Sequence, residues 1–118
     1  MPTPGSAEWL ASVTEESVEP ERAIIDTHHH LWKTAGMWGT YELDDLWADA
    51  GSGHNVEKTV FIDCHSNYRQ DGPSHLKPIG ETEYVTGVAE QSAKQAGRAT
   101  IAGIVSFANM TLGEAVEE

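Results

Sequence analysis

The sequence is poor in cysteine and in long apolar runs, and these shortages exclude a disulfide within the chain and a membrane-spanning helix. Cys64 is the only cysteine among 118 residues, so no disulfide can form within the chain, as is usual in a reducing compartment. No apolar run approaches the roughly 18 residues that a membrane-spanning helix needs. The N-terminus also lacks the basic and apolar regions of a signal peptide. We therefore expect a cytoplasmic protein with no membrane partner.

Basic residues are scarce as well. The chain has 7 Lys and Arg against 19 Asp and Glu, which gives a net charge of −12. Nucleic acids and anionic membrane surfaces are recognised through a basic footprint, so neither is expected as a partner. Apart from an acidic region between Glu15 and Glu21, the acidic residues are scattered. They indicate a solvated surface and do not select a substrate.

The hydrophobic pattern predicts an α/β chain in which strands and helices alternate. The expected strands cover residues 23–30, 56–63 and 100–107. Helices are expected over 41–50, from Gly80 to just before Gly97, and from about Thr111 onward. This order favours right-handed βαβ units and a parallel sheet.

The chain divides at the first expected strand. Residues 1–22 read as an N-terminal extension with a short helix over 7–16, capped by Ser6. Residues 23–118 contain the three strand–helix units. Because the third helix has only begun when the sequence reaches residue 118, we expect these units to belong to a larger fold. A complete small α/β domain is the alternative.

The most informative stretch is the histidine run at the end of the first strand. Side chains alternate along a strand, so Asp26, His28 and His30 share one face and His29 lies on the other. Two imidazoles on one face can hold a single divalent metal, and imidazole nitrogen suits Zn, Fe, Ni or Cu. We predict that His28 and His30 are metal ligands. His29 is predicted to have a structural role, packed or hydrogen-bonded on the other face.

The pattern Asp26-x-His28-x-His30 at the end of a first strand resembles the opening motif of the amidohydrolase superfamily. More narrowly, it resembles the amidohydrolase-2 group of TIM-barrel metal-dependent hydrolases. The segments EPERAIIDTHHHLW, YELDDLWADAGSGHNVEKTVFIDCHSNYRQDGP and LKPIGETEYV are all similar to the N-terminal third of that group. The resemblance covers nearly the whole chain, with the blocks in the same order.

The resemblance implies an α/β fold that is the N-terminal portion, about three βα units, of a (β/α)8 TIM barrel. A complete barrel takes about 250 residues, so the remaining units would come from a longer protein or from another chain. It further implies a divalent metal cofactor, with zinc preferred and manganese or iron as alternatives. Its remaining ligands and its catalytic base would lie on later strands. The catalytic residues are therefore unknown, and the chain alone is expected to be inactive.

Four residues are candidates for substrate binding because function in such barrels sits where strands end. They are Trp32, His65, Tyr68 and Arg69. Arg69 can hold a carboxylate by a forked contact, and Tyr68 can donate to a developing oxyanion. A solvated loop is the alternative for both. Trp32 and Trp38 can line a pocket, with core packing as their alternative.

The expected function is metal-dependent hydrolysis of a C–O or C–N bond in a small carbonyl compound such as a lactone, ester or amide. The alternatives are a metal-dependent decarboxylase or oxygenase of the same superfamily, or a non-catalytic subunit or fragment that is inactive on its own. An oligomer is possible. In a partial barrel we also expect apolar residues of the inner sheet face to meet water. These are Ile24, Val60, Ile62, Ile101, Ile104 and Val105.

Overall fold

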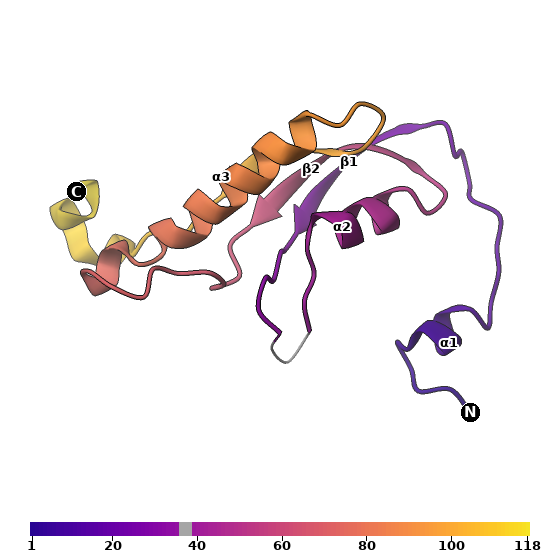
Figure 1. The fold of residues 1–118 in the computed structure, drawn as a ribbon, viewed down its shortest axis with the longest axis horizontal. Coiled ribbons are helices and arrows are strands. Elements are labelled where there is room, and N and C mark those ends of the chain that lie inside the picture. Colours follow the sequence, from indigo (N-terminus) through magenta and orange to yellow (C-terminus); the bar gives the residue numbers. More distant parts are fainter. Residues whose placement is uncertain (36–38) are drawn as a thin grey trace.

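The computed structural model describes residues 1–35 and 39–118 and has an α/β arrangement built on a parallel sheet (Figure 1). Its strands are β1 (Ala23–His29), β2 (Asn55–Ile62) and β3 (Thr100–Val105). They lie in the order β1-β2-β3, and both neighbouring pairs are parallel. The predicted parallel sheet is confirmed, and its carboxyl-terminal edge gathers the residues that follow all three strands.

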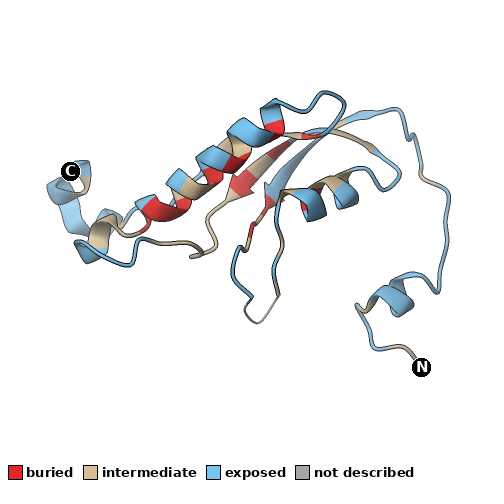
Figure 2. Ribbon diagram, viewed as in Figure 1, coloured by how far each residue is buried: buried red, intermediate tan, exposed pale blue. Residues whose placement is uncertain are grey.

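Two helices share one hydrophobic core with the sheet. Helix α2 (Leu43–Ala50) follows β1, and helix α3 (Ile79–Ala93) follows β2, with the short 3-10 turn η1 (Ser74–Leu76) before it. The buried cluster contains Leu31, Leu46, Phe61, Val85, Val88 and Ile101. Burying a valine or phenylalanine side chain contributes about 1.5–3 kcal/mol, so this cluster holds both helices on the same face of the sheet (Figure 2).

The N-terminal helix is shorter than predicted. Helix α1 covers only Ala7–Leu10, although Ser6 caps it as expected by accepting the Trp9 N–H at 3.2 Å. None of its residues is buried, and it lies apart from the sheet (Figure 1). A short helix without a packed face gains little beyond its own backbone hydrogen bonds, so the predicted continuation to residue 16 is wrong.

Two further element ends differ from the prediction. Helix α3 ends at Ala93, with Lys94 as its C-cap, and Gly97 lies in the following turn with φ at +80°. The last segment is a 3-10 helix, η2 (Met110–Glu117), rather than an α-helix, because Gly113 interrupts it with φ at +60°.

The expectation for the inner face of the sheet is partly wrong. Ile101 is only 5% exposed and belongs to the core beneath the helices, and Ile104 packs against the same core. A register shift between Thr59 and Val60 interrupts the pairing of β2 with β3. Because the shift follows Ile101, Ile101 and Ile104, which are three positions apart, face the same helices.

Other apolar side chains do meet solvent. Val105 is 49% exposed, and Ile25, which the sequence did not single out, is 59% exposed. Ile24, Val60 and Ile62 are half-buried. In the described ranges, no helix has both the length and the apolar content to cross a bilayer.

Candidate functional site

The end of β1 brings two histidines together. The Nε2 atoms of His28 and His30 lie 3.3 Å apart, and the rings meet edge to face with centroids 5.0 Å apart. His28 is exposed and His30 is half-buried. The two side chains therefore share one face of the strand, as the alternation predicts, and both direct the same ring nitrogen toward one point.

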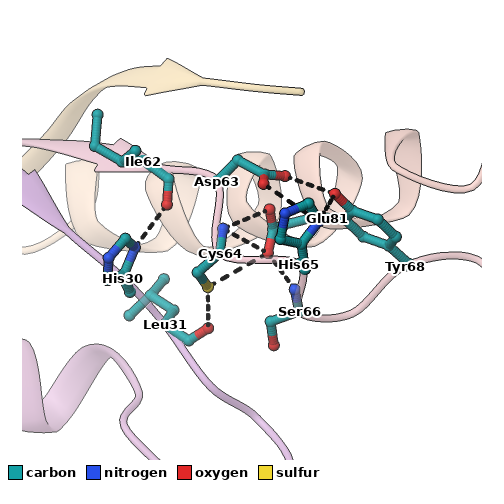
Figure 3. A network of polar contacts seen from close by, with 9 residues as sticks. All are labelled: His30, Leu31, Ile62, Asp63, Cys64, His65, Ser66, Tyr68 and Glu81. Carbon is teal, nitrogen blue, oxygen red and sulfur yellow. Dashed lines mark hydrogen bonds and ion pairs between the residues drawn. The ribbon is translucent and has the colours of Figure 1, made fainter. Parts of the chain in front are cut away.

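A neighbouring strand fixes the ring of His30. Its Nδ1 lies 2.8 Å from the carbonyl oxygen of Ile62, the last residue of β2 (Figure 3). A carbonyl oxygen only accepts hydrogen bonds, so Nδ1 must carry the proton. The lone pair is then on Nε2, the atom that faces His28. A ring N–H donated to a backbone carbonyl is the usual support of a metal-binding histidine.

His29 lies on the opposite face and is only 7% exposed. Its Nε2 is 3.0 Å from Thr59 Oγ1, and its ring lies edge-on to Phe61 at 5.7 Å between centroids. Burial lowers the pKa of His29, since a charged imidazole would lose its hydration there. The geometry gives His29 a structural position that anchors the end of β1 to the core.

The separation of the two Nε2 atoms fits a shared metal ion. Two nitrogens that each lie about 2.0–2.1 Å from zinc at a tetrahedral angle are about 3.3–3.4 Å apart. The observed 3.3 Å matches this spacing. Within residues 1–35 and 39–118, no group of three or more His, Cys, Asp or Glu side chains is placed to hold a metal. The described part of the chain thus offers a pair of ligands.

A hollow of about 350 Å³ lies beside the histidine pair. Asp26 lines it and accepts the backbone N–H of His28 at 3.1 Å. Trp32 also lines it, with its ring 5.5 Å from that of His30, and is held to Tyr41 by two backbone hydrogen bonds of 2.8 and 2.9 Å. The predicted pocket role of Trp38 falls outside the described residues.

A second polar cluster follows β2. The Tyr68 hydroxyl lies 3.0 Å from Asp63 Oδ2 and 2.7 Å from His65 Nδ1 (Figure 3). His65 has its backbone in the left-handed region, with φ at +59°, and its ring lies against Phe107 at 5.6 Å between centroids. Two of the predicted substrate-binding residues, His65 and Tyr68, are therefore in direct contact.

Glu81 was missed as a member of this cluster. It lies in the first turn of α3, a helix that the sequence predicted without singling out this residue. It is 2% exposed, and its carboxyl group accepts the N–H of Ser66 at 2.6 Å and that of Cys64 at 3.2 Å. Burial, together with the facing carboxyl group of Asp63, raises the pKa of Glu81 to about 7. No local sequence signal distinguishes a buried Glu at this position from a solvated one.

Cys64 is held as a thiol. Burial, and then the neighbouring Glu81, raise its pKa to about 12. Its Sγ lies 3.5 Å from Glu81 Oε2 and 3.8 Å from the Leu31 carbonyl oxygen, and its single proton can be donated to either. Since the thiolate is the reactive form, Cys64 contributes packing to this cluster and not a nucleophile.

Arg69 is engaged with a carboxylate of its own chain. Its guanidinium makes a forked contact with Glu83 of α3, through both Nε and Nη2. The contact is exposed, and it raises the pKa of Arg69 and lowers that of Glu83. The geometry shows that the fork can form, while its use for a substrate carboxylate stays a prediction.

No family model, curated protein or solved structure matches the chain.

Proposed function

We propose that this chain supplies the first three βα units of a (β/α)8 barrel in a metal-dependent hydrolase of the amidohydrolase superfamily. The observation that carries the proposal is the 3.3 Å separation of the His28 and His30 Nε2 atoms at the carboxyl-terminal edge of a parallel sheet. This edge is where barrels of this kind place their active sites. Later strands or another chain would complete the ligand set and the barrel.

The proposed ligands are His28 and His30, and the proposed substrate is a small lactone, ester or amide. A divalent ion bound here would polarise the carbonyl group and lower the pKa of a bound water molecule. The chain's own residues prepare the site. Ile62 fixes the tautomer and orientation of His30, and Asp26 holds the backbone at His28. Trp32 lines the hollow beside the pair, with its ring 5.5 Å from that of His30.

The proposal is tested by titrating zinc, with calorimetric detection, into the protein whose barrel has been completed by the later strands or by the other chain. The double variant His28→Ala/His30→Ala should lose the bound metal. The matched control His54→Ala/His75→Ala removes the same number of imidazoles from elsewhere and should bind one equivalent, as the unaltered protein does. Equal zinc binding by the two double variants would contradict the proposed site.

A second measurement addresses the reaction. Hydrolysis of dihydrocoumarin, an aromatic lactone, should follow metal content and disappear in the histidine-pair variant. Metal analysis separates the alternatives, because an oxygenase needs redox-active iron or manganese whereas hydrolysis proceeds with zinc. Full activity in metal-free protein would refute the mechanism.

A further inference from the structure

The cluster of Asp63, His65 and Tyr68 supplies no ligand to the proposed metal centre. It follows β2 directly, on the strand next to the one that carries the histidine pair (Figure 3). The Tyr68 hydroxyl has a neighbour on each side, Asp63 Oδ2 at 3.0 Å and His65 Nδ1 at 2.7 Å. A phenol carries a single proton, so Tyr68 can donate to only one of them.

The carboxylate decides which way the proton points. Burial opposes ionisation of Asp63, but hydrogen bonds from Glu81 and Tyr68 outweigh it and hold the pKa of Asp63 low. Glu81, whose pKa is raised to about 7, holds the proton that the two carboxyl groups share below that pH, and Asp63 stays ionised both below and above it. An ionised carboxylate only accepts hydrogen bonds. Tyr68 therefore donates to Asp63, and the Nδ1–H of His65 donates to the Tyr68 oxygen.

This arrangement leaves the lone pair of His65 on Nε2. The ring is largely exposed, with 67% of the side chain accessible, and Phe107 lies along it. The left-handed backbone at His65 is unfavourable for a residue with a side chain. It is held in place because Glu81 accepts the backbone N–H groups on both sides of it, those of Cys64 and Ser66. The loop thus presents the Nε2 atom of His65 as a hydrogen-bond acceptor at the carboxyl-terminal edge of the sheet.

We propose that His65 is a proton acceptor at this edge, and that Tyr68 and Asp63 position it. The reaction in which it acts rests on the proposed function. As water attacks the carbonyl carbon, a water O–H bond breaks and its proton goes to His65 Nε2. The bond to the leaving oxygen or nitrogen then breaks, and that atom takes the proton from Nε2. The imidazolium formed in between is balanced by Asp63, whose Oδ1 lies 3.8 Å from Nδ1.

The tautomer of His65 tests the inference without metal or substrate. The protein is labelled with ¹⁵N-histidine, and ring nitrogen shifts are recorded at about pH 8, above the ordinary pKa of histidine. If the assembly is too large for solution spectra, the shifts are recorded by solid-state NMR with magic-angle spinning. The signals of His65 are assigned by their absence in the variant His65→Gln. We expect an Nδ1–H tautomer that changes to Nε2–H in Tyr68→Phe. The Nδ1–H tautomer should persist in the control variant Tyr84→Phe. This variant also removes a tyrosine hydroxyl, but one that is hydrogen-bonded to Glu42 and not to His65. An Nε2–H tautomer in the unaltered protein would overturn the inference.

Chemical rescue provides the second readout. In the metal-loaded protein, His65→Ala should slow dihydrocoumarin hydrolysis by at least ten-fold, and free imidazole should restore part of the rate. An unchanged rate in this variant would overturn the role of His65 in the reaction. The two proposals can fail separately. Zinc binding that does not depend on His28 and His30 counts against the proposed function, while the tautomer decides the inference about His65 in either case.

Discussion

The imidazole of His30 at the end of β1 is tied to the carbonyl oxygen of Ile62 at the end of β2, with Nδ1 and the oxygen 2.8 Å apart. One hydrogen bond thus links the parallel pairing of two strands to the orientation of a proposed metal ligand. Because β1 and β2 end side by side, the pairing that builds the sheet also selects the His30 tautomer that leaves Nε2 free.

Zinc should stabilise the fold through this pair. A ligand that binds only the folded state at one hundred times its Kd adds about 2.7 kcal/mol to the free energy of unfolding. We expect zinc to raise the Tm of the protein and magnesium, which prefers oxygen ligands, to leave it unchanged. Differential scanning fluorimetry measures both. A zinc effect of the same size in His28→Ala/His30→Ala would contradict the prediction.

Thr59→Val should destabilise the protein by roughly 1–3 kcal/mol. The substitution keeps the shape of a fully buried side chain but leaves His29 Nε2 without its partner at 3.0 Å. Urea unfolding followed by circular dichroism measures the change. Thr86→Val is the matched control, since the Thr86 hydroxyl bonds an exposed helix carbonyl. Equal effects of the two variants would show that the buried contact contributes nothing.

The contribution of Glu81 to stability should fall as pH rises from about 4.5 to about 7, whereas the contribution of His29, whose pKa is lowered by burial, rises toward pH 6.5. The folded protein holds the Glu81 proton up to about pH 7, whereas the unfolded chain releases it near 4.5. The stabilisation is therefore complete below 4.5 and is lost through pH 7. At 1.36 kcal/mol per pKa unit, its upper limit is roughly 3 kcal/mol.

Asp63 acts in the opposite sense and in a lower range. Its pKa is lowered on folding, so its contribution is present above about 3.8 and is lost as the pH falls further. Glu81→Gln should remove the fall in stability between pH 4.5 and 7 and leave the rise from His29 and the loss of stability at acid pH from Asp63. Urea unfolding across this range measures both. A fall that survives in Glu81→Gln would assign it to another group.

Gly80→Ala should destabilise the protein, whereas Gly87→Ala in the same helix should not. A Cβ at Gly80 would stand 2.5 Å from the Arg69 nitrogen and 2.8 Å from the Asn67 oxygen, both backbone atoms that cannot move easily. Such overpacking costs about 1–3 kcal/mol. At Gly87 nothing lies within 4 Å, so the better helix propensity of alanine should stabilise by up to about 1 kcal/mol. Thermal unfolding of both variants decides the matter, and equal Tm values would refute the prediction.

The isolated 118-residue chain should associate. Both outer strands of the sheet, β1 and β3, have an edge without a partner strand among the described residues, and such edges pair readily with other chains. Ile25, Val105 and Phe107 are also 59%, 49% and 46% exposed. Equilibrium ultracentrifugation should report species larger than a monomer. A monodisperse monomer with cooperative unfolding would show that these residues form a complete small domain.

The sequence by itself determined the three strands, helices α2 and α3, and the placement of the histidine pair on one face of β1. Alternation along a strand placed His28 and His30 on one face without any knowledge of the rest of the chain, because that geometry is local. The hydrophobic pattern predicted the strand over 56–63 and the helix over 41–50 for the same reason.

Only the tertiary structure decided the polar cluster after β2 and the points at which the helices end. Glu81 is buried because the loop after β2 folds over the start of α3 and offers it two backbone N–H groups, a contact between residues 15 and 17 positions apart. A register shift between β2 and β3 follows Ile101, so that Ile101 and Ile104, three positions apart, both pack on the helix side of the sheet. Helix α1 stopped at Leu10 because nothing packs on it. Each outcome depends on which distant segments meet, and local propensity carries no information about that.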